Sequence, residues 1–148
     1  MTFQITILGC GSSGGVPRVG GDWGACDPQN PKNRRRRCSI LVERFWGDER
    51  TVVLVDTSPD LREQLLSSGS TQIDGILLTH AHADHVHGID DVRPLVIKMK
   101  RRIGAYMDEP TRDLVQMRFD YIFETPPGRD RKSTRLNSSH ANISYAVF

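Results

Sequence analysis

The sequence has few cysteines, no long apolar run and no secretion signal, and each shortage excludes a class of protein. Its three cysteines, Cys10, Cys26 and Cys38, are odd in number and widely spaced, which argues against a disulfide framework. No apolar run approaches the roughly 20 residues that cross a bilayer, and the N-terminus lacks the basic and apolar segments of a signal peptide. We therefore expect a cytoplasmic protein without a membrane partner.

The net charge of +2 is small for 148 residues, and it arises from the end of the chain. Residues 130–148 resemble the in-frame translation of a sequencing-library adaptor, in which Ala141 and Asn142 occupy the place of the variable index. We expect this segment to be a non-native tail, which is kept out of fold reasoning, and residues 1–129 to form a partial domain. Without the tail the charges balance, so the charge does not indicate nucleic-acid binding.

A strand and a glycine-rich loop open the chain. Residues 3–8 alternate apolar and polar side chains, which predicts a half-buried strand. Residues 9–15 then contain the G-x-G-x-x-G spacing of dinucleotide-binding turns, but that site requires a helix to begin there. Pro17 and the glycines after it break any helical period, so the nucleotide hypothesis fails. A loop whose backbone can pass close to a substrate or a metal centre remains.

The rest of the pattern predicts an α/β protein. Helix signals include Ser58 as a cap before Pro59, an apolar face of Leu61, Leu65 and Leu66, and a stop at Gly69. A second helix is expected to end at Pro94. The predicted strands are residues 3–8, 39–43, 51–55, 73–79 and 103–107, and the predicted helices are residues 58–69, 89–96 and 109–119, with a further element from 121 to 124.

Four consecutive arginines, Arg34 to Arg37, form the densest charge run. Such a run is usually a solvated face. The alternative is that one or two guanidinium forks hold a phosphate, which suits them as bidentate donors. The sequence leaves both hypotheses open.

Four of the five histidines, with an aspartate among them, lie just after the predicted strand 73–79. Imidazole nitrogen and carboxylate oxygen are good ligands for zinc, and also for manganese or iron. His80 and His82 can aim at one ion while Asp84 and His85 aim at a second. The alternative is a polar loop whose histidines only form hydrogen bonds, but this spacing makes a metal site the better hypothesis. His87 falls outside the pattern, so we expect it outside the ligand set.

Residues 79–85, Thr-His-Ala-His-Ala-Asp-His, resemble the H-x-H-x-D-H motif of the metallo-β-lactamase fold hydrolases, and Asp56 at the end of an earlier strand fits the same family. The resemblance implies the N-terminal half of an αβ/βα sandwich, with a mixed sheet inside and helices outside. It implies two zinc ions, with His80 and His82 on the first and Asp84 and His85 on the second. Asp84 would also assist proton transfer, and Asp56 would orient a ligand from outside the coordination shell.

Within that family the chain is similar to two branches, ribonuclease Z and the phosphoribosyl cyclic phosphate phosphodiesterases. The features that favour the second are residues 14–18, 34–39 and 56–65. That branch carries a cysteine cluster for an extra zinc after its glycine-rich loop, where this chain has Cys26 alone. The resemblance therefore implies hydrolysis of a small cyclic phosphate or related phosphodiester, with lactone or thioester hydrolysis as the alternative. Nucleic acid is a less favoured partner, and a homodimer is left open.

The family's sites also need further ligands, and after His87 only His140 remains, inside the apparent adaptor. Two protein ligands per ion are fewer than the three of a catalytic zinc. We therefore expect the chain as given to be an inactive fragment, or at most a weak metal binder, of an active parent hydrolase. The missing half of the fold would also leave apolar surface exposed.

Overall fold

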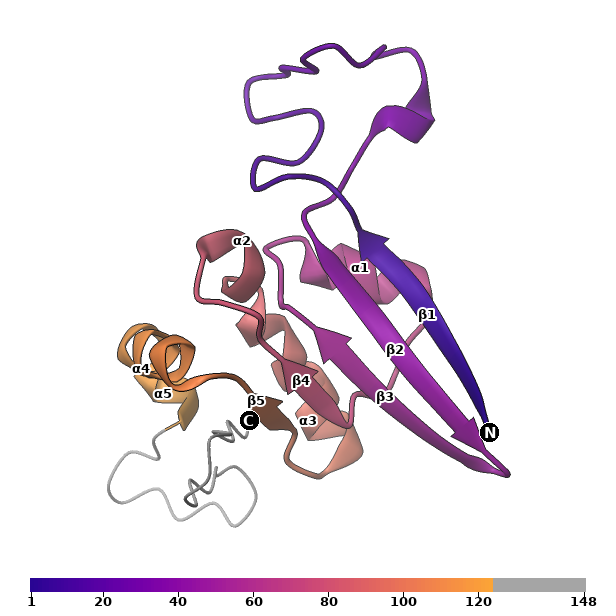
Figure 1. Ribbon diagram of the computed structural model, residues 1–148, viewed down its shortest axis with the longest axis vertical. Coiled ribbons are helices and arrows are strands. Elements are labelled where there is room, and N and C mark those ends of the chain that lie inside the picture. The colour runs from indigo at the N-terminus through magenta and orange to yellow at the C-terminus, as the bar shows by residue number, and fades with distance from the viewer. Residues whose placement is uncertain (124–148) are drawn as a thin grey trace.

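A mixed five-stranded sheet forms the centre of the computed structural model, which describes residues 1–123 (Figure 1). The strands lie in chain order: β1 (Thr2–Gly9), β2 (Ser39–Trp46), β3 (Glu49–Val55), β4 (Gly75–Leu77) and β5 (Gly104–Tyr106). The first three strands are antiparallel, while β3, β4 and β5 are parallel. The predicted α/β class, with a mixed sheet and outer helices, is confirmed.

The hairpin of β2 and β3 has the predicted position but longer strands. A two-residue turn at Gly47 and Asp48 connects them, and Gly47 adopts a φ of 56°, which a glycine reaches without steric cost. Leu41 pairs with Leu54 across the hairpin, so two large apolar side chains lie on the same face. This hairpin sets the register of the sheet.

Helices cover one face of the sheet. These are α1 (Leu61–Ser68), the 3₁₀ helix η2 (Ile89–Val92) and α3 (Arg93–Met99), and α1 and α3 lie behind the sheet in Figure 1. They enclose a core in which Leu41, Leu54 and Ile76 are almost fully buried. The remaining helices are η1 (Pro31–Asn33), α2 (Ala83–Val86), α4 (Glu109–Arg118) and α5 (Asp120–Phe123).

The opposite face is apolar, and among residues 1–123 no helix or strand covers it (Figure 1). Phe3, Ile5 and Ile7 project from β1 on this side and are 58%, 64% and 67% exposed. The alternation in residues 3–8 correctly predicted a strand, but the apolar members expected in the core face this open side. Among the apolar residues of β1 only Leu8 enters the core, because alternation places it on the side of Gln4 and Thr6, which faces the helices.

Three helix signals were misassigned. Helix α1 begins at Leu61 with Asp60 at its N-cap, because the Ser58 hydroxyl is buried and donates to Gln64 instead. Leu66 is 63% exposed, and the buried polar side chain of Gln64 takes its expected place beside Leu61 and Leu65. Pro94 lies in the first turn of α3 rather than at the end of a helix. In a first turn the missing N–H of proline breaks no hydrogen bond within the helix.

Candidate metal centre

The histidine loop, which we define as residues 79–88, leaves β4 at the carboxyl end of the parallel strands. Its middle forms α2, a single turn that begins after His82. Parallel strands collect ligand-binding loops at this end of a sheet. The long loop from residue 10 to residue 38 extends from the same end of the sheet (Figure 1).

The loop brings the predicted ligands together. The His80 ring lies 4.6 Å from that of His82 and 4.0 Å from that of His85, measured between centroids. Asp84 Oδ2 is 3.4 Å from His85 Nε2. These nitrogen and oxygen donors fit zinc chemically. Within residues 1–123, no group of three or more His, Cys, Asp or Glu side chains is placed so that it could hold a metal ion, so the ligand roles stay predictions.

Asp56 fixes the His85 side of this cluster. The carboxylate is almost fully buried, and its Oδ2 lies 2.7 Å from His85 Nδ1. It also accepts from the Thr79 backbone N–H at 2.8 Å and from the Thr79 hydroxyl. The backbone of Asp56 has a φ of 61°, a left-handed conformation that aspartate tolerates better than most residues and that often occurs at functional sites. The structure thus brings Asp56 into contact with His85, and its role in orienting a metal ligand stays a prediction.

The end of β3 holds the histidine loop through its backbone. The Thr57 N–H donates to the His85 carbonyl at 2.7 Å, and the Gly88 N–H donates to the Thr57 carbonyl at 2.9 Å. A Cβ on Gly88 would lie 1.9 Å from the Ser58 carbonyl oxygen, so only glycine allows this approach. The sequence analysis missed these contacts because they join residues about thirty positions apart.

The arginine run is tied to α1 and to its own loop. Arg37 forms a bidentate pair with Asp60, with nitrogen–oxygen distances of 2.9 and 2.6 Å. The hydrogen bond from Arg37 lowers the pKa of Asp60, and the same bond raises the pKa of Arg37. Arg36 donates to the Ser67 hydroxyl, and Arg34 lies over the Trp23 ring. Because Asp60 occupies the Arg37 fork, the phosphate hypothesis loses support at that residue.

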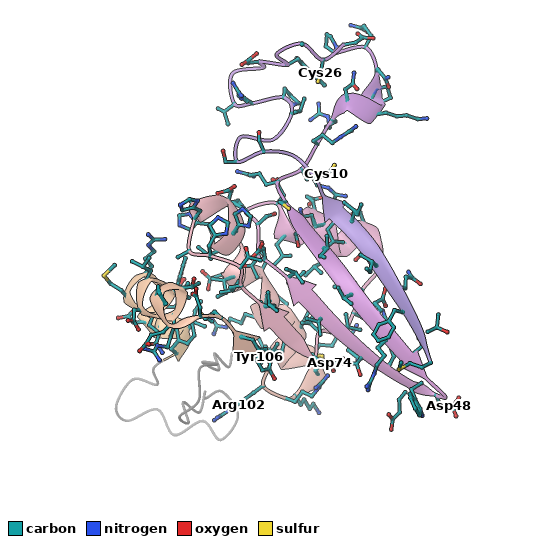
Figure 2. The ribbon with its side chains drawn as sticks, viewed as in Figure 1. Cys10, Cys26, Asp48, Asp74, Arg102 and Tyr106 are labelled. Carbon is teal, nitrogen blue, oxygen red and sulfur yellow. The ribbon has the colours of Figure 1, made fainter. Side chains whose placement is uncertain are left out.

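The three cysteines are free thiols. Cys10 lies at the base of the loop that follows β1 and Cys26 lies at its far end (Figure 2). Burial raises the pKa of the Cys38 thiol, and the negative charge of Asp56 adds to the effect. Within the described residues, these thiols belong to no group of three or more His, Cys, Asp or Glu side chains that could hold a metal ion.

His87 contacts the end of α4. Its ring meets Phe119 edge to face at a centroid distance of 5.8 Å, and both line an open pocket beside the loop. Arg118, at the end of α4, donates to the Ala81 carbonyl between His80 and His82. The sequence offered no signal for Arg118 or Phe119, which are ordinary helix-end residues. His140 lies outside the described residues, as does the predicted tail.

The matched family is described as a beta-lactamase superfamily domain, and its model covers residues 51–144. A solved diphosphatase from the PhnP family is 43% identical, with a TM-score of 0.72, over 82% of this chain and 47% of that chain. An octanoyltransferase of Porphyromonas gingivalis is 37% identical over 84% of this chain and 24% of that protein. A ribonuclease Z of Bradyrhizobium sp. is 43% identical over 40% of this chain and 19% of that protein. The chain thus spans about half the length of the solved relative and less of the curated ones.

Proposed function

We propose that this chain, which belongs to the beta-lactamase superfamily, supplies the first metal ligands of a metal-dependent phosphodiesterase. The predicted resemblance to the metallo-β-lactamase fold hydrolases, in the branch of the cyclic phosphate phosphodiesterases and ribonuclease Z, is confirmed by the family match and by the relatives. The carrying observation is the contact of buried Asp56 with His85, beside the rings of His80 and His82. It supports a cluster built to present imidazole nitrogens rather than a polar loop.

His80, His82, Asp84 and His85 would hold zinc, with two ions in the complete protein and manganese or iron as alternatives. Bound zinc lowers the pKa of a coordinated water so that hydroxide is available near neutral pH. Asp56 would accept a hydrogen bond from His85 Nδ1–H, in the tautomer that leaves Nε2 free to bind metal. Asp84 would also accept or return a proton during hydrolysis.

Phosphorus esters are the favoured substrates. Two relatives are named as a diphosphatase and a ribonuclease, and both names refer to chemistry at phosphorus. The octanoyltransferase and the ribonuclease match over only 24% and 19% of their lengths, so the diphosphatase, matched over 47% of its chain, carries the preference for chemistry at phosphorus. A small phosphodiester, such as a cyclic phosphate, is the proposed substrate, and a lactone or thioester is the alternative.

The complete activity requires more than residues 1–123. His80, His82, Asp84 and His85 give two ligands for each ion, whereas catalytic zinc usually has three and a water. The uncovered sheet face supports the same proposal, because Phe3, Ile5 and Ile7 would be buried by a further layer. The third possibility is therefore that the chain alone binds metal weakly and turns over nothing.

The test is hydrolysis by the purified chain supplied with zinc, with bis(p-nitrophenyl) phosphate and a thioester as substrates. The proposal expects release of p-nitrophenol to exceed thioester cleavage and to be lost in His82→Ala. Lys98→Ala is the matched control, because Lys98 is an exposed residue of α3 that is neither a proposed ligand nor a lining residue of the pocket, and the variant should retain activity. Preferential thioester cleavage would favour the alternative, and no turnover of either substrate would favour the inactive fragment.

A further inference from the structure

An open pocket with a volume of about 620 Å³ lies beside the histidine loop. Only His82, among its lining residues, belongs to the proposed metal ligands. The other lining residues are Ala81, Ala83, His87, Arg118 and Phe119. The pocket therefore borders the reaction site without being part of the ligand cluster.

Arg118 supplies the positive charge of this pocket. One of its terminal nitrogens donates to the Ala81 carbonyl, which fixes the guanidinium beside His82. No carboxylate within residues 1–123 pairs with Arg118, whereas Arg37 pairs with Asp60 and Arg112 with Glu109 and Asp113. A guanidinium has five N–H donors, so several remain for a ligand.

The side of the pocket formed by Phe119 is held by contacts with residues 87–90. Phe119 packs against the core and meets the His87 ring. Two residues later, the Tyr121 hydroxyl donates to Asp90 at 2.5 Å, and this bond raises the pKa of Tyr121 to about 12. Contacts of residues 118, 119 and 121 thus hold the end of α4 on the histidine loop, and the pocket is built from packed residues.

We propose that this pocket binds a second phosphate group of the substrate, held by Arg118 while the reacting phosphoryl group lies at the histidines. The inference rests on the proposed function and narrows its substrates to phosphodiesters or diphosphates that carry two phosphate groups. Arg118 suits this role because its planar fork matches phosphate oxygens, and because its charge has no carboxylate partner among residues 1–123. The small side chains of Ala81 and Ala83 leave room for the group.

The test uses the metal-free chain and inorganic phosphate, so that it does not depend on zinc binding or hydrolysis. Phosphate is titrated at pH 8 and followed by backbone amide shifts in NMR spectra. The proposal expects the largest shifts at Ala81, His82 and Phe119, and an affinity about tenfold weaker in Arg118→Gln. Arg112→Gln removes an equal charge from the same helix outside the pocket and should bind phosphate like the unaltered chain.

A structural role for Arg118 predicts a different result. If Arg118 acts only through its hydrogen bond to the Ala81 carbonyl, Arg118→Gln would lower the unfolding midpoint and weaken zinc and phosphate binding together. That result would overturn the proposal. Arg118→Lys keeps the charge without the fork and should fall between the other two variants. Unchanged phosphate affinity in Arg118→Gln, or shifts centred on residues 34–37, would also overturn it. Failure of zinc binding with Arg118-dependent phosphate binding retained would count against the proposed function alone.

Discussion

Both faces of the sheet are apolar, but among residues 1–123 helices cover only one of them. Leu41 and Leu54 on the helix side are almost fully buried, while Ile5 and Ile7 on the other side are more than half exposed. Neighbouring strands continue the open side, since Ile5 pairs with Val42 and Val42 pairs with Val53. A contiguous apolar face of this kind indicates a surface that another element covers.

This difference shows that alternating polar and apolar residues predict a strand with two distinct faces. The alternation does not predict which face is buried by residues 1–123. In β1 the more apolar face is the open one, because the polar members Gln4 and Thr6 share the side of Leu8. The helix side is a core formed within residues 1–123. The open side, with Phe3, Ile5 and Ile7 exposed, is the surface on which the proposed function expects a further layer.

The largest expected effect compares one substitution on each face. Leu54→Ala should lower the free energy of unfolding by about 2–5 kcal/mol, because it leaves a cavity in a packed core. Ile5→Ala should change it by less than about 1 kcal/mol, because the side chain is already exposed to water. Urea unfolding followed by circular dichroism measures both. Equal losses would mean that the open face is buried, for example between two copies of the chain.

A smaller effect on stability is expected on the helix-covered side of the sheet. There an ion pair between Arg37 and Asp60 connects the arginine run to the start of α1. The pKa of Asp60 lies below its ordinary value of 3.8 because Arg37 donates to its carboxylate. Its charged form therefore stabilises the fold above that ordinary value, and this stability is lost as pH falls through the lowered pKa. Asp60→Asn should cost about 1 kcal/mol at pH 7, and the difference should shrink below about pH 4.

The control for this pH dependence is Glu63→Gln on the same helix. Glu63 pairs with Arg62, and both side chains are more than 60% exposed, so the change should cost less than about 0.5 kcal/mol. Unfolding free energies measured from pH 3 to pH 7 separate the two variants. An Asp60→Asn deficit that stays constant down to pH 3 would contradict the role given to the Arg37 pair.

Much of the fold was predictable because its signals are local. The hairpin around Gly47, the helix stop at Gly69 and the order of the elements follow from turn chemistry and periodicity. The start of α1 was not predictable, because the Ser58 hydroxyl donates to the buried Gln64 and accepts from the N–H of Asp60, which precedes the first helical residue. The partner of the Ser58 hydroxyl depends on tertiary packing, which a local sequence pattern does not predict.

The candidate site divides in the same way. Spacing alone predicted that His80, His82, Asp84 and His85 lie together, and the rings of the three histidines do cluster. The sequence could not reveal Thr79 as a partner of Asp56, or Arg118 as a lining residue of the pocket. These contacts link separate elements, and they depend on the path of the backbone between them.

The central claim is that the histidine loop binds zinc and that Asp56 orients His85 for it. Competition with a chromophoric chelator measures the zinc affinity of the chain and of Asp56→Asn, in which asparagine also tolerates the positive φ. We predict an affinity about 10–100-fold weaker in Asp56→Asn, with no change in His87→Ala. Equal zinc affinities in the unaltered chain and in Asp56→Asn would contradict the claim.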